Sequence, residues 1–141
     1  MKTIFTLAAF LFILLFEHNA DSADFSSKVN SNEAQHLVLL ANPDATDESL
    51  YFDKRTEAEA QLFFIFDGLS ICHGCNGSYG FFAVNKWTGD VWALWGCYKQ
   101  RTRALQKAQV AIKRRFSPSE LHDYQRLSRL KPECTFDRND G

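Results

Sequence analysis

The sequence lacks a hydrophobic run long enough to cross a membrane. Its one extended apolar stretch runs from Ile4 to Phe16, follows Lys2 and is ended by Glu17 and His18. A charged start, about a dozen apolar residues and then small residues are typical of a secretory signal peptide, whereas a spanning helix needs about 20 apolar residues. We therefore predict a signal peptide over residues 1–22 and an exported protein, periplasmic or extracellular, with no stable membrane span after its removal.

The sequence also lacks the motifs of common metal and cofactor chemistry. A four-cysteine zinc site needs two close cysteine pairs, and only Cys72 and Cys75 are close. These two cysteines enclose His73 and Gly74 with the spacing of a thiol–disulfide oxidoreductase. In such enzymes a helix after the motif lowers the pKa of the first thiol, and no helix is predicted at that place in this chain. We expect no metal, no cofactor and no catalytic residue, and we keep a redox role for Cys72 and Cys75 as an alternative.

Cysteine is scarce, and its number is even. The exported chain contains Cys72, Cys75, Cys97 and Cys134. In an oxidising compartment such a set most simply forms two disulfides, with three possible pairings. We favour Cys97 with Cys134, because this bridge ties the end of the chain to the predicted hairpin, and Cys72 with Cys75 as a local bridge; crossed pairings stay open. A loop of 36 intervening residues gives the first bridge roughly 3 to 4 kcal/mol of stabilisation.

Net charge is small, and its division along the chain is more informative than its total. The formal charge is −1, but residues 23–67 carry nine acidic and three basic side chains, whereas residues 86–131 carry eleven basic and three acidic. The simplest interpretation is that the two halves attract each other within one fold. The basic residues lie around a predicted helix without interleaved aromatic residues, which argues against a nucleic-acid partner.

Aromatic residues are abundant, and they gather in one stretch. Residues 79–85 and 90–96 are rich in aromatic and β-branched side chains, and residues 86–89 between them have the composition of a short turn. We predict an antiparallel hairpin here as the centre of the fold. Its rings alternate between two faces, so they form either a core or an exposed surface, and Trp87 at the turn is the ring that we most expect to be exposed.

A protein-binding edge is predicted next to this hairpin. The glycine-rich loop over residues 73–80 and the turn together offer polar and aromatic side chains to a partner, and exposed aromatic residues commonly anchor interfaces. The predicted partner-binding residues are His73, Asn76, Tyr79 and Trp87.

Two helices are predicted after the hairpin and at least one before it. Residues 99–115 contain neither Gly nor Pro and keep their apolar residues on one face. Residues 118–130 follow a capping box, with Ser117 as cap, Pro118 at the first helical position and Glu120 at the third. Residues 32–41 have helical apolar spacing after Ser31.

Residues 57–69 are ambiguous. Thr56 and Glu59 have the spacing of a capping box, and strong helix formers follow, so we predict a helix from Glu57 to about Leu69. The alternative is a buried strand over Leu62 to Phe66, since this apolar run has no period of its own.

These elements predict one small α+β domain braced by disulfides. We place it over residues 31–134, after a flexible lead-in over residues 23–30 and before a tail over residues 135–141.

The hairpin sequence resembles that of a group of small bacterial proteins. Residues 81–92, FFAVNKWTGDVW, are followed by Gly96-Cys97, a basic helix and the closing Pro132-Glu133-Cys134. This pattern over residues 79–134 resembles small periplasmic immunity proteins that neutralise cell-wall-degrading effectors of contact-dependent (type VI) secretion, and periplasmic inhibitors of cell-wall hydrolases.

The resemblance implies a binding protein rather than an enzyme. Such a protein inhibits a partner, a cell-wall hydrolase or a toxin, by covering its active site. The hairpin tip or the loop over residues 72–80 would insert into a groove of the partner, with Trp87 and Tyr79 as anchors, and the basic helix would steer an acidic partner. A structural envelope protein without a dedicated target is a further alternative.

Overall fold

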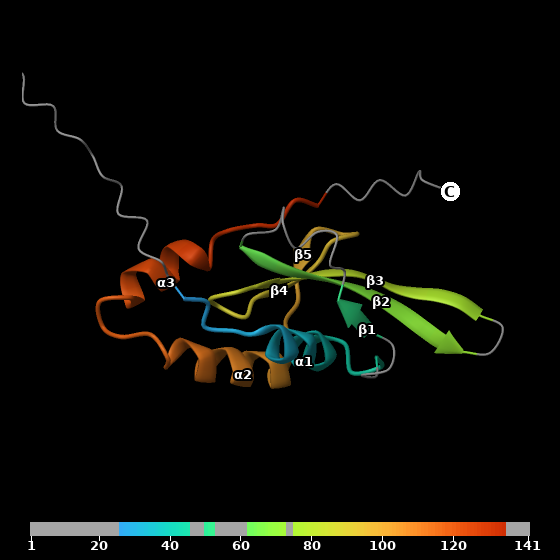
Figure 1. Cartoon of the computed structure of the whole chain (residues 1–141), viewed down its shortest axis with the longest axis horizontal. Helices are drawn as coiled ribbons and strands as arrows, with labels where there is room; N and C mark the ends of the chain where they lie inside the picture. The colour runs from blue at the N-terminus through green and yellow to red at the C-terminus, as the bar shows by residue number, and fades with distance from the viewer. Residues whose placement is uncertain (1–25, 46–49, 53–61, 73–74, 135–141) are drawn as a thin grey trace, which may run out of the picture.

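The computed structural model describes residues 26–45, 50–52, 62–72 and 75–134, and this part of the chain forms one antiparallel sheet and three helices (Figure 1). The strands lie in sequence order, β1-β2-β3-β4-β5. The strands are β1 Leu50–Phe52, β2 Phe63–Cys72, β3 Cys75–Asn85, β4 Val91–Ala93 and β5 Tyr98–Lys99, and the helices are α1 Ser31–Ala41, α2 Arg103–Lys113 and α3 Leu121–Leu127. The predicted α+β class, the central hairpin and the two C-terminal helices are confirmed. Both helices are shorter than predicted: α2 begins at Arg103 rather than at residue 99, which belongs to β5, and α3 begins at Leu121 rather than at Pro118.

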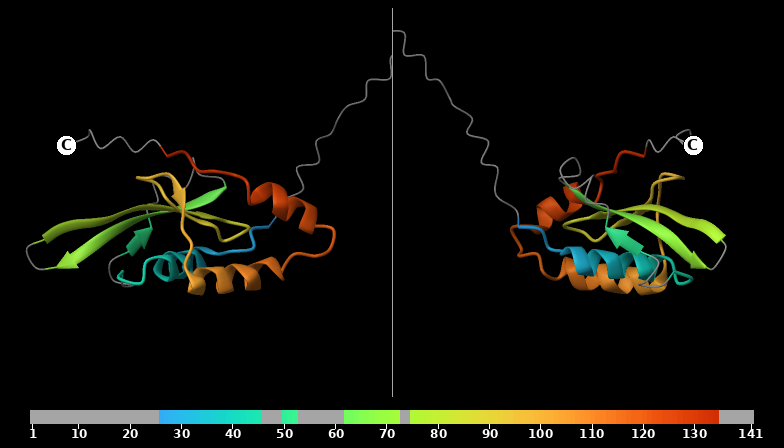
Figure 2. Two further views of the ribbon diagram at one scale, coloured as in Figure 1. Left: turned by 180° about the vertical axis from the view of Figure 1, so that it is seen from behind. Right: turned by 45° about the vertical axis from the view of Figure 1, so that its right-hand side comes forward.

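The two faces of the sheet are covered in different ways. Helices α1 and α2 lie side by side against one face, and the segment after α3, residues 128–134, crosses the other face (Figure 2). None of the helices in the described ranges is long and apolar enough to span a bilayer. The sheet is therefore the middle layer of the domain, with a helical layer on one side and an extended cover on the other.

Each face has its own core. The main core lies between the sheet and the helices, and its buried residues are Val29, Ala34, Leu37, Val38, Ala41, Phe66, Phe82, Val84, Val91, Ala93, Leu105, Ile112, Phe116 and Leu127. The second core lies under the C-terminal segment and contains Phe63, Ile65, Ala83, Trp92 and Leu94, against which Leu130 and Cys134 pack. Successive residues of β2, β3 and β4 alternate between the two cores.

The helix predicted over residues 57–69 is wrong from Phe63 onward, where β2 begins; residues 57–61 lie outside the described ranges. The physical reason is burial on both faces. Phe66 belongs to the main core, whereas Phe63 and Ile65 belong to the second core. The sequence of a strand that is buried on both faces is a continuous apolar run without alternation. The alternative prediction, a buried strand in the 62–66 region, is therefore confirmed.

The first two helices begin at side-chain caps. Asn30, one residue earlier than expected, caps α1 by accepting a hydrogen bond from the backbone N–H of Glu33. Thr102 caps α2 by accepting one from the N–H of Leu105. The Thr102 hydroxyl also donates to the carbonyl of Leu40 in α1 at 2.6 Å, so the second cap joins the two helices.

The predicted flexible lead-in is wrong at its C-terminal end. Val29 is fully buried in the main core, and its N–H donates to the carbonyl of Lys86 at 2.9 Å. Lys28 forms an ion pair with Glu120, 2.8 Å from Nζ to Oε1, and its carbonyl accepts a hydrogen bond from Arg115. Residues 28–30 therefore belong to the packed body of the domain, because an apolar side chain and an ion pair hold them to it.

The predicted capping box at Ser117 is present in the turn before α3. The Ser117 N–H donates to Glu120 Oε2 at 2.7 Å, and the Glu120 N–H donates back to the Ser117 hydroxyl at 3.4 Å. The hydrogen bond from Lys28, followed by those from Ser117, lowers the pKa of Glu120 from 4.5 to about 2. The carboxylate is thus favoured in its charged form by the contacts of the folded chain.

We expect Glu120 to make folding stability depend on acid. A carboxyl whose pKa is lower in the folded state stabilises it above the ordinary pKa, and this contribution is lost as pH falls from about 4.5 toward 2. In thermal unfolding followed by circular dichroism, Glu120→Gln should lower Tm at pH 6 and match the unsubstituted protein near pH 2. The exposed Glu133→Gln serves as the control. Parallel Tm curves for the Glu120→Gln and unsubstituted proteins across this range would contradict the assignment.

Candidate functional site

The turn between β3 and β4 is held by a buried side chain. Asn85 has no exposed surface, and its Oδ1 accepts hydrogen bonds from the N–H groups of Trp87 at 2.9 Å and Thr88 at 3.1 Å. Its Nδ2 donates to the carbonyl of Leu127 in α3 at 3.0 Å. Asn85 therefore fixes the turn and joins it to the last helix.

The remaining polar residues of this turn are also satisfied inside the fold. Asp90 is 5 % exposed, and its Oδ2 lies 2.8 Å from both the Thr88 hydroxyl and the Lys99 ammonium group. Gln109 of α2 donates to the carbonyl of Gly89 at 3.1 Å. Gly89 has a φ of +69°, and a Cβ there would lie 2.5 Å from Ile112 Cδ1. The buried polar residues of the motif on which the sequence resemblance rests, Asn85, Thr88 and Asp90, are therefore used to build the turn.

Burial and the negative charge of Asp90 both influence the pKa of Tyr124 in helix α3. Burial, and then the negative charge of Asp90, raise the pKa of the Tyr124 hydroxyl. Tyr124 packs edge-on against Phe116, with ring centroids 5.0 Å apart, and Lys113 lies over its other side. These contacts hold the half-buried Tyr124 ring against the body of the domain.

The prediction that Trp87 is the exposed ring is wrong. Trp87 is half-buried and packs against the main core, because the hydrogen bonds of Asn85 tighten the turn onto the body of the domain. The most exposed tryptophan of the described chain is Trp95, at 48 %. A partner-binding role of Trp87 stays a prediction, but its packing gives it a structural role as well.

Two of the other predicted binding residues, Asn76 and Tyr79, belong to the far half of the β2–β3 hairpin. His73 is outside the described ranges, and Asn76 and Tyr79 lie in β3, with side chains that are also outside them. The register pairs Gly68 with Gly80 and Leu69 with Ser78, so Tyr79 is the extra residue of a β-bulge. Bulges bend a strand and redirect a side chain, and they are frequent next to binding sites.

This far end forms a projecting arm, which we define as residues 69–72 and 75–79. Strand β1 pairs with β2 no further than Gly68, and β4 pairs with β3 only at Phe82–Val84. Among the described residues the two strands of the arm thus pair only with each other, and the arm extends beyond α1 and α2 (Figure 1). The backbone places Asn76 and Tyr79 on the part of the sheet farthest from the helical layer.

A second exposed feature consists of aromatic rings after β4, for which the sequence left open a place in the core or on the surface. Trp95 packs edge-on against Phe81, with ring centroids 6.2 Å apart, and lies over Gly80, where a Cβ would be 3.2 Å from its ring. Tyr98 is 56 % exposed. Strand β4 ends at Ala93, so Trp95 lies in the turn over residues 94–97 and leaves the buried alternation of the strand.

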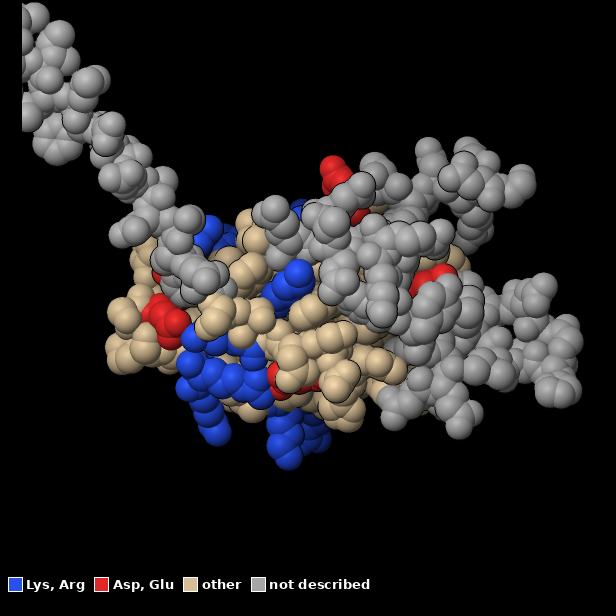
Figure 3. Space-filling model, viewed as in Figure 1, with Lys and Arg blue, Asp and Glu red and all other residues tan. Residues whose placement is uncertain are grey.

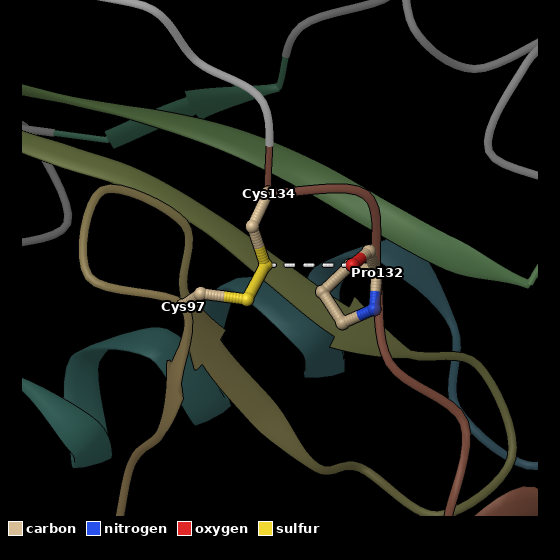
Figure 4. Close-up of a disulfide and its surroundings, with 3 residues drawn as sticks. All are labelled: Cys97, Pro132 and Cys134. Carbon is tan, nitrogen blue, oxygen red and sulfur yellow. Dashed lines mark hydrogen bonds between the residues drawn. A yellow bond between two sulfur atoms is a disulfide. The ribbon is translucent and has the colours of Figure 1, made fainter.

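The disulfide between Cys97 and Cys134 is confirmed. Their Cα atoms are 5.5 Å apart, and the bridge joins the turn between β4 and β5 to the end of the C-terminal segment (Figure 4). Cys134 Sγ lies 3.4 Å from the carbonyl oxygen of Pro132. The bridge therefore holds the cover of the second core in place and fixes the loop that carries Trp95.

The backbone around Cys72 and Cys75 argues against the redox alternative. These residues end β2 and begin β3, where they are register partners, and their side chains are outside the described ranges. Because β3 continues from Cys75 as a strand, the helix N-terminus that lowers a thiol pKa in such enzymes is missing here. In the described part of the chain, no three His, Cys, Asp or Glu side chains gather as metal ligands would.

Comparison with known proteins identifies a shared fold. No protein-family description matches the sequence, and no curated protein matches it either. Among solved structures, the chain is similar to one chain in the structure of a type VI secretion system effector-immunity complex from Pseudomonas protegens, with a TM-score of 0.51 and 15 % identity, over 70 % of this chain and 88 % of that chain. The fold is therefore one that occurs in an effector-immunity complex.

Proposed function

We propose that this chain is an exported, non-enzymatic binding protein of the immunity type, which neutralises a partner protein by covering its active site. The observation that carries the proposal is the fold shared with a chain of an effector-immunity complex. The apolar run from Ile4 to Phe16 supports export, and the Cys97–Cys134 disulfide supports a periplasmic or extracellular location, since such bridges persist in oxidising compartments. The partner is a cell-wall hydrolase or a toxin.

The arm supports a mechanism of inhibition by insertion. The arm extends beyond the helical layer, and within the described residues each of its two strands pairs only with the other. The arm can therefore enter a groove without unfolding the body. The bulge at Tyr79 changes the direction of the strand near this end. In this mechanism Tyr79 and Asn76 contact the partner's active-site groove, and the protein needs no catalytic group of its own.

The test is a complex with the product of the adjacent gene. The two proteins are mixed, their mass is measured by light scattering after size exclusion, and hydrolysis of purified peptidoglycan is followed. We expect a stoichiometric complex and loss of hydrolysis. The absence of a complex at about 10 μM, or a complex with full hydrolytic activity, would contradict the proposal.

Substitution of Tyr79 tests the role of the arm within that complex. Because a buried aromatic anchor contributes about 2 kcal/mol or more to an interface, Tyr79→Ala should weaken binding at least about tenfold. The control is Tyr98→Ala, which removes an exposed ring on the body. Trp87→Ala is unsuitable as a first test, because Trp87 packs against the main core and its loss also affects folding. Equal losses for Tyr79→Ala and Tyr98→Ala would exclude a specific role of the arm.

A further inference from the structure

Helix α2 presents a row of cationic side chains to solvent. Leu105 and Ile112 are buried and fix its inner face. With 3.6 residues per turn, the positions opposite this face follow one another at intervals of four, three and four residues and span about 16 Å. We call this row the basic ridge; it consists of the exposed residues Arg103, Lys107, Val110 and Arg114.

The ridge is visible on the molecular surface. Lys and Arg side chains line the lower edge of the space-filling view, where α2 runs in the ribbon diagram (Figure 3). At the middle of the row lies Val110, which is 52 % exposed. An apolar residue surrounded by charged ones is the arrangement of a small protein interface, in which an apolar centre is enclosed by a polar rim.

The cations of the ridge are not used within the described fold. Several other basic residues have partners there: Lys28 pairs with Glu120, Lys99 with Asp90, Arg115 with Glu33 and Arg126 with Asp123, and Lys86 and Lys113 lie over aromatic rings. The exposed Arg101, Arg129 and Lys131 form no ion pair within the described residues. Among the described residues, neither an ion pair nor a side-chain hydrogen bond involves Arg103, Lys107 or Arg114. Charge attraction within this part of the chain therefore does not explain the ridge.

The N-terminal part of the ridge is also unfavourable for the helix that carries it. The first turn of α2 contains no acidic residue, and Arg103 places a positive charge at its N-terminus, which is the positive end of the helix dipole. Arg103 and Lys107 are four residues apart, where like charges repel. The helix dipole alone would favour a carboxylate at position 103, so the stability of α2 does not account for the arginine there.

We propose that the basic ridge is the docking surface for an acidic surface of a partner protein, with Val110 packing at its centre. The identity of that partner rests on the proposed function, whereas the chemistry of the surface does not. A protein suits it better than a nucleic acid or a membrane. The ridge has three charges in one row and no aromatic residue for stacking, and the whole chain has a formal charge of −1, so general attraction to polyanions is weak.

The experiment compares two charge reversals of equal size. Arg103→Glu/Lys107→Glu changes the ridge, and Arg129→Glu/Lys131→Glu changes two other exposed cations and serves as the matched control. Association with the product of the adjacent gene is measured at about 50 and 300 mM salt. We expect the ridge variant to associate at least about tenfold more slowly at low salt and the control to stay within about threefold. If the complex forms and the ridge variant behaves as the control, the ridge proposal is wrong although the proposed function stands.

A titration without that partner separates the two proposals. Amide NMR spectra of the full exported chain are recorded with a deca-glutamate peptide, a 12-base-pair DNA duplex and phosphatidylglycerol vesicles. We expect the peptide to shift the amides of residues 103–114, in a salt-sensitive way, and the ridge variant to lose this response. Such binding would keep the ridge proposal even if no complex with the adjacent gene product formed. Tighter binding of the duplex or of the vesicles to the same amides would overturn it.

The thermal stability of a single variant distinguishes a role of Arg103 in partner binding from a role in the fold. Arg103→Glu alone places a carboxylate in the first turn of α2, four residues before Lys107, so we expect Tm to rise by about 2 to 5 °C while association slows. A fall in Tm would show that Arg103 serves the fold, and would overturn the assignment of the ridge to a partner.

Discussion

Replacement of Asn85 by alanine is expected to lower the free energy of unfolding by about 3 kcal/mol or more. The substitution removes one donor and one acceptor that together serve the Trp87 and Thr88 N–H groups and the Leu127 carbonyl. Thr88 is fully buried, so its N–H group loses its partner where water does not easily replace it, and each such loss costs about 1 to 3 kcal/mol. Urea unfolding followed by tryptophan fluorescence measures the difference.

The adjacent Lys86 provides the control for this experiment. Its ammonium group lies over the ring of Phe64, 4.9 Å from the centroid, and the residue is half-buried. Lys86→Ala removes one cation–π contact and should cost about 1 kcal/mol or less. If Asn85→Ala is no more destabilising than Lys86→Ala, the turn does not depend on the Asn85 side chain, and α3 is held by its apolar contacts alone.

Removal of the Cys97–Cys134 bridge is expected to have an effect of similar size. For a sequence separation of 37 residues, the entropy of the unfolded chain gives roughly 3 to 4 kcal/mol, and Cys97→Ser/Cys134→Ser should lose this amount. The C-terminal segment also covers the second core, so the variant should expose Trp92 before global unfolding. A urea titration gives the stability, and a red shift of tryptophan emission at low urea reports the local opening.

The double variant Cys72→Ser/Cys75→Ser is the matched control, since it also removes two cysteines. A bridge between these residues closes a loop of only a few residues and should contribute less than about 2 kcal/mol. Peptide mapping of the purified protein without reduction shows which bridges exist. A larger loss from the Cys72 and Cys75 pair than from the Cys97 and Cys134 pair would contradict this account.

The elements that the sequence predicts best are those with local signals. The capping box at Ser117 and Glu120 has its hydrogen bonds, and the residue types of the 86–89 turn follow from the side chain of Asn85 and the positive φ of Gly89. The pairing of Cys97 with Cys134 followed from their positions after the hairpin and at the end of the last helix. Each of these features depends on residues that are close in sequence or on a choice among few alternatives.

The features that the sequence did not predict depend on tertiary contacts. Whether Phe63–Phe66 forms a strand depends on the presence of a cover on both faces, and the second cover comes from Leu130 and Cys134, far along the chain. The short β1 depends on pairing with β2 rather than on its own composition. The same limit applies to Trp87 and Trp95, whose exposure depends on how each turn folds against the body.

The candidate site was predictable only in part for the same reason. The sequence placed Asn76 and Tyr79 near the end of a hairpin, but the bulge at Tyr79 depends on a register between two strands that no local pattern specifies. The sequence also indicated that the helix after the hairpin is basic. Which of its cations are without partners followed only from the ion pairs that the others form with distant residues.

The segment that covers the second core lies at the C-terminal end of the domain, and this position affects the order in which the domain folds. Trp92 and Leu94 leave the ribosome well before Leu130 and Cys134, so until then the nascent sheet has one apolar face that nothing in its own core covers. The second core therefore cannot be completed until synthesis of the chain is almost finished. The Cys97–Cys134 bridge likewise depends on the last residues of the domain, so it can close only after the sheet and the helices have been made.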